Sequence, residues 1–333
     1  MRRTLSVLLL SFGLVTASAL LDAAAPAKGA RQRPATKSSH GSVKDRFLGT
    51  WKLVSVEQRD AKGELLPPSS PSASRVGFII YDPAGYMAVA IMPGGRQKYA
   101  DAQPTPEEAK AALTGYTGYF GTFTVNEAER FVTHHLQGSL NPSMGADQKR
   151  LFEFSGNRLM LKPPPGPTGN QAQVTWERVP DLPNLTAAHR QFIGFWKLVS
   201  NERRSAKGEL VSSNPGQTGY IIYMPTGQMM VHMMQPGRKT YAGAQPTPEE
   251  ARETIRTYTN YFGPYYIHEA DRYVVHDQIG TLNQGRNGPS PQQRFYEFSG
   301  GRLMLKPPST TVDGQQVQGT ITWERVSGQS ASR

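Results

Sequence analysis

The side chains best suited to chemistry are histidines in two matching stretches of the chain. His134 and His135 stand side by side, and their counterparts are His276 and Asp277. Adjacent residues of a strand point to opposite faces, so His134 and His135 cannot bind one metal ion together. No other group of His, Asp or Glu has the spacing of a metal site, and the chain has no cysteine. We therefore predict no bound metal.

Two interpretations of His134 and His276 stay open. Each is either a polar contact or general base inside a cavity, or an ordinary surface or hydrogen-bonded core residue. No Gly-x-Ser-x-Gly motif, P-loop or Gly-x-Gly-x-x-Gly motif is present. The glycine-rich segment 115–121 has the wrong spacing for such a loop. We predict no catalytic residue and no cofactor.

The two histidine stretches match because the chain repeats itself. Residues 47–55 return as 192–200, and both copies close on Trp-Glu-Arg-Val, at Trp176 and Trp323. The offset between copies drifts only between 142 and 147 residues, which indicates short loop insertions. This period is far longer than the roughly 20–50 residues of a solenoid unit, so each copy is expected to be a domain with its own core.

Each repeat reads as about eight strands separated by Gly/Pro turns, with one helix between them. In the first repeat, 77–81 and 86–92 form a predicted hairpin. Ser42 is expected to cap a short helical turn that runs into Phe47. The predicted fold class is all-β with one helix per repeat, arranged as two tandem antiparallel β-barrels.

The helix of each repeat has a clear start. Thr105, Pro106 and Glu108 form a capping box with proline at the first helical position, and the second repeat has the same signal. We expect this helix to carry aromatic residues at spacings of three and four, as a cover over one barrel end. These residues are Tyr116, Tyr119 and Phe120, with Tyr258, Tyr261 and Phe262 in the second copy.

Strand alternation also predicts which side chains line the barrels. One face of the second hairpin strand is apolar in both copies, and we assign it to the interior. Its members are Met87, Val89 and Ile91, with Met229, Val231 and Met233 in the second copy. Methionines there suit an adaptable apolar pocket, although a small barrel can also be packed solid. Glu153 and Glu297, each between two aromatic residues, are expected to face solvent.

Several of these stretches resemble a known family. Gly49-Thr50-Trp51 and Gly194-Phe195-Trp196 are similar to the Gly-x-Trp of lipocalins, in which a basic side chain from the last strand covers the tryptophan. Arg178 and Arg325 are the candidates for that role. With Tyr116 to Gly121 and the stretch around His134, each repeat resembles the bacterial lipocalin-like domain family. The resemblance implies a lipocalin-like β-barrel and no defined general activity.

The first residues of the chain suggest export. Met1-Arg2-Arg3, an apolar stretch and Ala17-Ser18-Ala19 are typical of a signal peptide, and the apolar part is short for a membrane span. We expect a signal peptide at 1–21, a disordered basic linker at 22–46, lipocalin-like domains at 47–179 and 192–327, and a linker at 180–191. The mature protein would be periplasmic or secreted, with no membrane span.

Charge distribution argues against nucleic acid as a partner. The net charge is +11. More than half of it lies in residues 1–46, and the repeats show no basic stripe.

The leading prediction for function is non-catalytic binding of a small apolar or amphipathic molecule. The alternatives are an enzyme of the isomerase, cyclase or hydratase kind, and a structural or interaction module with filled barrels. The predicted contacts are the apolar faces, the aromatic residues and His134 with His276. We expect the first repeat to bind more specifically, because the second has Ile279 in place of Gln137 and lacks the second histidine.

Overall fold

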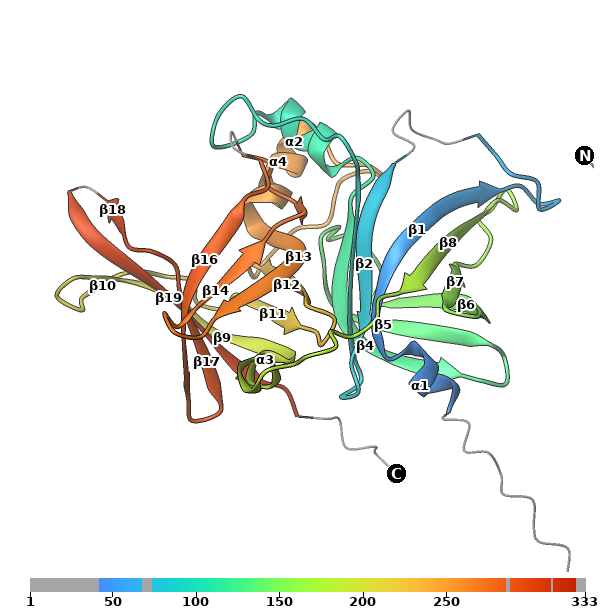
Figure 1. Cartoon of the computed structure of the whole chain (residues 1–333). Coiled ribbons are helices and arrows are strands. Elements are labelled where there is room, and N and C mark those ends of the chain that lie inside the picture. Colours follow the sequence, from blue (N-terminus) through green and yellow to red (C-terminus); the bar gives the residue numbers. More distant parts are fainter. Residues whose placement is uncertain (1–41, 68–73, 286–287, 313, 328–333) are drawn as a thin grey trace, which may run out of the picture. The chain divides into compact units, whose positions relative to one another are not determined.

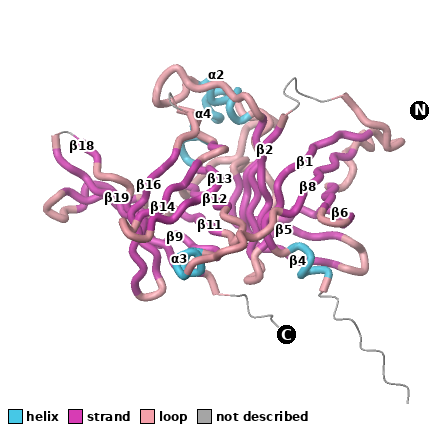
Figure 2. The backbone as a smooth tube through the Cα atoms, viewed as in Figure 1, coloured by secondary structure: helices cyan, strands magenta, loops and turns pink. Residues whose placement is uncertain are grey.

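The computed structural model describes residues 42–67, 74–285, 288–312 and 314–327 (Figure 1). The expected signal peptide and residues 22–41 of the expected linker lie outside them. Strands dominate this part of the chain, as the magenta segments of Figure 2 show, and they close into one antiparallel barrel per repeat. The predicted fold class, two tandem antiparallel β-barrels, is confirmed.

The first barrel consists of eight strands in chain order, and the last strand pairs with the first. The hairpin expected over 77–81 and 86–92 is present as β2 and β3. The strands are β1 (Gly49–Arg59), β2 (Arg75–Tyr81), β3 (Tyr86–Pro93), β4 (Thr117–Asn126), β5 (Phe131–Ser139), β6 (Asp147–Ser155), β7 (Arg158–Lys162) and β8 (Gln171–Arg178).

The second barrel repeats this circuit, and β19 pairs back with β9 to close it. Its circuit is β9 (Gly194–Ser205), β11 (Thr218–Tyr223), β12 (Gln228–Met234), β13 (Tyr258–His268), β14 (Tyr273–Asp277), β16 (Pro291–Ser299), β17 (Arg302–Lys306) and β19 (Gln315–Arg325). Three short strands pair at its margins: β10 (Leu210–Ser213), β15 (Gly280–Thr281) and β18 (Thr310–Val312).

In the described part of the chain, two short helices accompany each barrel. A one- to two-turn helix precedes each barrel, α1 (Val43–Phe47) capped by Ser42 as expected, and α3 (Ala187–Phe192), which the sequence reading did not anticipate. The predicted central helices are α2 (Pro106–Leu113) and α4 (Pro248–Thr257), and both have the expected capping box. Among the described residues, no helix is long and apolar enough to cross a bilayer.

The prediction that these central helices carry the aromatic residues is wrong. α2 ends at Leu113, because Gly115 follows with a φ of +74° that helical residues do not adopt. The ring-bearing residues continue into β4, and in the second copy β13 begins at Tyr258, directly after α4. Tyrosine, phenylalanine and threonine favour the pleated backbone, and here their tertiary contacts outweigh the helical spacing.

The end of each barrel beside the short first helix is closed by the predicted tryptophan–arginine pair. The Arg178 guanidinium lies 4.1 Å from the Trp51 ring centroid and donates hydrogen bonds to the carbonyl groups of Leu48 and Arg46. The Trp51 indole N–H donates to the Phe47 carbonyl at 2.7 Å. Arg325 and Trp196 repeat this arrangement with a 4.3 Å separation. The expected cover of the Gly-x-Trp tryptophan is therefore confirmed.

The buried apolar residues form three cores, one inside each barrel and one between the barrels. The face of β3 with Met87, Val89 and Ile91 lies in the first barrel's interior, and the matching face of β12 lies in the second. The opposite faces of β3 and β12 pack between the barrels, which belong to one compact unit. The predicted interior face is thus confirmed.

Candidate functional site

A buried histidine in each barrel is held between two tyrosine hydroxyl groups. In the first barrel, His134 Nε2 lies 2.8 Å from the Tyr81 hydroxyl, and Nδ1 lies 2.9 Å from the Tyr119 hydroxyl. In the second, His276 Nε2 lies 2.7 Å from Tyr223 and Nδ1 3.1 Å from Tyr261. A neutral imidazole donates from one nitrogen and accepts at the other, so one tyrosine in each barrel accepts and one donates.

His135 points the other way, as strand alternation requires. Its Nε2 lies 2.8 Å from the Thr124 hydroxyl and its Nδ1 3.0 Å from Asp147, outside the barrel. The two neighbouring histidines therefore do not share a ligand. Among the described residues, no group of three or more His, Asp or Glu side chains is arranged to hold a metal ion.

Burial keeps the interior histidines neutral. Loss of hydration, helped by the positive charge of Arg150 and by His135, lowers the pKa of His134 to about 3. Burial also lowers the pKa of His276 well below its usual value, and Arg294 adds to the effect. The same desolvation raises the pKa of Tyr81 and Tyr119. At neutral pH this cluster is therefore a set of neutral hydrogen-bonding groups, and its histidine is too weak a base for efficient proton transfer.

Each interior cluster also contains an arginine and a glutamine that the sequence reading missed. Arg150 is on the same face of β6 as Phe152, and its charge acts on Tyr81, Tyr119 and His134. It donates to the Gln148 amide oxygen at 3.2 Å and to the Lys149 carbonyl at 2.8 Å. The signal was present in the alternation of 148–154, because the inward aromatic residues of β6 place residue 150 inward as well.

The second barrel repeats this polar set. Arg294 donates to the Gln292 amide oxygen at 3.4 Å and to the Gln293 carbonyl at 2.7 Å. Its charge acts on His276, Tyr223 and Tyr261. The described part of the chain shows no ion pair between either interior arginine and a carboxylate.

Glu153 and Glu297, the acidic residues of β6 and β16, are exposed as predicted. Their partners are on the outer surface as well. Lys162 lies 3.9 Å from Glu153, and Lys306 lies 3.2 Å from Glu297. These carboxylates do not reach the barrel interior.

The polar cluster of the first barrel separates a closed end from a more open one. Towards α1 the interior is filled by fully buried rings, among them Phe47, Trp51 and Trp176. Towards the other end of the strands, Val56 and Val174 pack against the core but remain partly exposed. In the second barrel the position of Val56 is taken by Asn201, whose amide donates to Gln217 at 3.0 Å. The first barrel is thus the more apolar at its open end.

The predicted aromatic contacts divide between two places. Tyr119 and Tyr261 face the barrel interiors, where they hold the histidines. The remaining four do not cover a barrel end but are buried in the core between the barrels. These four are Tyr116, Phe120, Tyr258 and Phe262.

Two arginines tie the barrels together in a reciprocal manner. Arg96 of the first repeat donates to the carbonyl groups of Thr281 and Leu282, and Arg238 of the second donates to those of Ser139 and Leu140. Each guanidinium also lies about 5 Å from a tyrosine ring, at 5.1 Å for Arg96 and 5.0 Å for Arg238. The repeats therefore meet through matching surfaces, as the subunits of a two-fold dimer do.

The centre of the core between the barrels is polar on one side. His232 of β12 is fully buried, with Nδ1 2.9 Å from the Tyr258 hydroxyl. Asn260 donates to the Val231 carbonyl at 2.8 Å and accepts from the Tyr116 hydroxyl. Burial lowers the pKa of His232 to about 3. This network lies between the repeats and is separate from the two barrel interiors.

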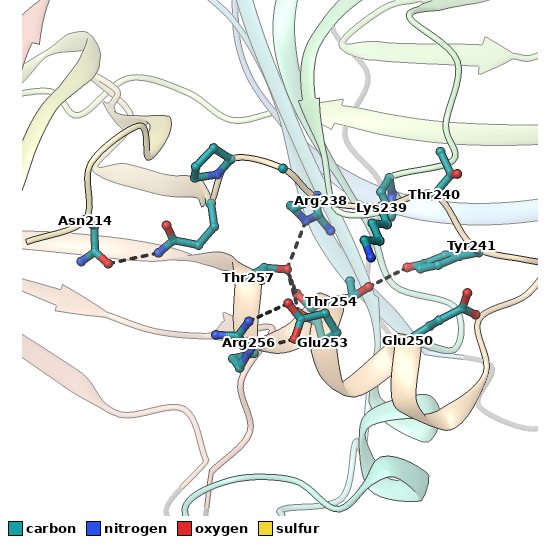
Figure 3. Close-up of a pocket in the computed structure, with 14 residues that line it drawn as sticks. Asn214, Arg238, Lys239, Thr240, Tyr241, Glu250, Glu253, Thr254, Arg256 and Thr257 are labelled. Atoms are coloured by element: carbon teal, nitrogen blue, oxygen red, sulfur yellow. Dashed lines mark hydrogen bonds and ion pairs between the residues drawn. The ribbon is translucent and has the colours of Figure 1, made fainter.

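Several surface cavities lie outside the barrels. One of about 650 Å³ lies against α4 and segment 235–241, with Pro142 of the first repeat on its wall (Figure 3). Arg256 pairs with Glu253 at 2.7 Å, and Arg238 donates to the Thr257 hydroxyl. The residues that line this cavity include none of the two interior histidine clusters.

A comparison with known protein families supports the barrel architecture. The family model of the lipocalin-like domain matches the chain twice, at residues 48–179 and 193–326. No curated protein matches the chain.

Two of the similar solved structures span nearly the whole of the compared chains. A protein of unknown function from Nostoc punctiforme is 12% identical, with a TM-score of 0.22, covering 86% of this chain and 100% of that one. A candidate outer membrane protein from Bacteroides fragilis is 8% identical, with a TM-score of 0.23, covering 85% and 99%. These TM-scores are too low to support a functional argument.

Proposed function

Because this chain belongs to the lipocalin-like domain family, with a matching domain in each half, we propose that it is an exported binding protein. Its ligand is a small apolar or amphipathic molecule, held inside a barrel without catalysis. The observation that carries the proposal is the buried His–Tyr–Tyr cluster of each barrel, which offers polar contacts next to apolar walls.

The contacts we propose in the first barrel are Met87, Val89 and Ile91 as apolar wall, with Tyr119 and His134 as polar groups. The corresponding side chains of the second barrel are Met229, Val231 and Met233 with Tyr261 and His276. The first barrel is the preferred site, since Val56 lines its open end where the second barrel has Asn201.

The low pKa of His134 favours binding over the isomerase, cyclase or hydratase alternative. Proton transfer is most efficient when the pKa of the catalytic group lies near the working pH, and about 3 is far from neutral.

One observation favours the competing function, an interaction module with filled barrels. Both interiors contain large, fully buried rings, among them Trp51 and Trp176 in the first barrel and Trp196 and Trp323 in the second. The two functions differ in whether a ligand binds inside the open end of a barrel, and ligand binding can be measured.

Export and the domain limits complete the proposal. The charged start and apolar stretch within 1–21 support a cleaved signal peptide, and domains at 47–179 and 192–327 agree with the extent of the family match. Mass determination of the protein recovered outside the cytoplasm tests the cleavage. A recovered chain that still carries residues 1–21 would contradict it.

Native mass spectrometry of the protein purified from its own host tests the binding function. A bound mass of lipid size is expected on the wild-type protein, and repeated recovery of empty protein would favour the interaction module instead. Val174→Trp should narrow the open end of the first barrel and remove most of the bound mass. Ile321→Trp is the matched change in the second barrel, where we expect a smaller loss.

The identified ligand then allows a titration. His134→Ala should weaken binding several-fold or more, because the Tyr81 and Tyr119 hydroxyls both lose their partner and Tyr119 is no longer held in place beside the ligand. A buried hydroxyl left without a partner costs roughly 1–3 kcal/mol. His276→Ala should matter less. Equal binding curves for wild type and His134→Ala would reject this site.

A further inference from the structure

We propose that the molecule bound in the barrels carries an anionic head group, which pairs with the guanidinium of Arg150 in the first barrel or Arg294 in the second. The inference rests on the binding function proposed above and narrows its ligand to amphipaths with a negatively charged head, such as carboxylates.

Arg150 points into the first barrel. Residues 150, 152 and 154 share the inward face of β6, and Arg150 lies close enough to the fully buried Tyr119 and His134 to act on both. Its main chain pairs with Val132, a residue with no exposed surface. The guanidinium is therefore directed into the barrel.

Arg150 has no counter-charge from the protein. The carboxylates of the first barrel that form ion pairs do so outside it, with Arg59, Lys149 and Lys162. Within the described residues, no ion pair involves Arg150 or Arg294. A guanidinium carries a fixed positive charge, and a charge partly withdrawn from water is stabilised by an opposite charge. An anionic ligand would supply it.

Arg150 has hydrogen-bond donors to spare. Two of its N–H groups bond to the neutral oxygens of Gln148 and Lys149, and its guanidinium also hydrogen-bonds to the Tyr119 hydroxyl. A guanidinium has five N–H donors in a planar fork that matches a carboxylate. With the Tyr119 hydroxyl beside it, the cluster can offer further donors to an anion without first breaking an ion pair.

The second barrel contains the same polar groups. Arg294, Gln292 and Tyr261 reproduce the set around His276, so the same head group fits both. The walls differ, because Asn201 replaces Val56 at the open end of the second barrel. Both barrels should therefore prefer the same head group, whereas an apolar tail should bind better in the first barrel.

The test compares two probes that differ only in head-group charge. The whole mature chain, stripped of co-purified molecules, is titrated with the fluorescent fatty acid cis-parinaric acid and with its methyl ester at about pH 8, where carboxylates are ionised. The wild-type protein should bind the acid about tenfold more tightly than the ester, as expected for a charge-assisted pair. This comparison needs no variant.

Variants then locate the effect. Arg150→Gln should lower the affinity for the acid to about that for the ester measured on the same variant, and Arg150→Lys should keep part of the preference. Arg294→Gln should have a smaller effect. Arg158→Gln is the matched control, since it removes one positive charge from an exposed position on the neighbouring strand β7.

The outcomes separate the two proposals. Equal affinity for acid and ester in the wild type overturns the anionic head group and leaves barrel binding standing. A preference for the acid that survives Arg150→Gln and Arg294→Gln, in folded protein, overturns the role of these arginines. If the wild-type protein binds neither the acid nor the ester, the proposal that the barrels bind such amphipaths is overturned as well.

Discussion

The histidine clusters inside the two barrels are alike, whereas in the core between the barrels only the second repeat contributes the large polar side chains. Each barrel holds its histidine between two tyrosines beside an interior arginine. Between the barrels, Ala90 and Gly118 of the first repeat correspond to His232 and Asn260 of the second. A Cβ on Gly118 would lie 3.5 Å from His232 Cε1, so the small residue of one repeat meets the large residue of the other.

This difference follows from position. Side chains inside a barrel meet only their own repeat, so both copies can keep one arrangement. Side chains near the axis that relates the repeats meet their own counterparts, and two histidines would compete there for the same space. The interface is therefore specialised for one first and one second repeat, while the histidine clusters inside the two barrels remain equivalent.

The largest effect is expected at the reciprocal arginines. Arg96→Ala or Arg238→Ala leaves two carbonyl groups of the other repeat without a charged donor, and each should lower the free energy of unfolding by about 3 kcal/mol. Urea unfolding measures this. Similar losses would support a symmetric clamp, and a loss in only one variant would show that the clamp is one-sided.

The second largest loss of stability is expected in the polar network of His232, Tyr258 and Asn260 between the barrels. His232→Ala removes a buried ring and leaves the Tyr258 hydroxyl without its partner, for a loss of about 2–3 kcal/mol in the same assay. Ala90→Ser at the matching position of the first repeat is the control and should cost much less. Equal losses would contradict the asymmetry of this core.

The free energy of unfolding should decrease in acid because of the buried histidines, both inside the barrels and between them. The pKa of His134 and of His232 is about 3 in the folded protein and near 6.5 when unfolded, so the unfolded chain binds more protons between these values. Stability is full above about pH 6.5 and falls towards pH 3, by up to about 1.4 kcal/mol per pH unit for each such histidine.

Substitution of one buried histidine should make this loss shallower. His134→Gln and His232→Gln are compared with His268→Gln, which alters an exposed histidine. Unfolding curves from pH 7 to pH 4 give the slopes. Parallel slopes for all four proteins would contradict the buried, neutral state of the two histidines.

The smallest effect is expected at the closed barrel ends, where the repeats agree most. Arg178→Ala and Arg325→Ala each remove a guanidinium from a tryptophan face and should cost about 1 kcal/mol, since both arginines are partly exposed. Tryptophan fluorescence during unfolding reports both. Clearly unequal losses would show that the two ends, despite matching geometry, are not equivalent.

The repeat and its strand pattern were sufficient to predict the barrels. Alternation along β3 and β12 correctly placed the methionine-bearing faces inside, and Thr105 and Thr247 correctly marked the helix starts. Alternation along β6 predicts an inward Arg150 as well as an outward Glu153, because a strand places every second residue on one face. The position of this arginine was therefore open to prediction from the sequence.

Other features depend on residues far apart in the chain. A spacing of three and four in Tyr116, Tyr119 and Phe120 fits a helix, yet these residues continue into a strand whose two faces meet different cores. Nothing local shows that Tyr81 and Tyr119 hold one histidine, since 53 residues separate Tyr81 from His134.

By itself, the sequence determined the duplication, the barrel class, the helix caps and the inward faces, because these depend on local periodicity and on comparison of one copy with the other. Only the tertiary structure decided that the opposite faces of β3 and β12 are buried too, and that Arg150 and Arg294 join the histidine clusters. A strand face that is buried against another barrel shows no sequence pattern that identifies its partner, because the burial arises only when the two folded barrels come together.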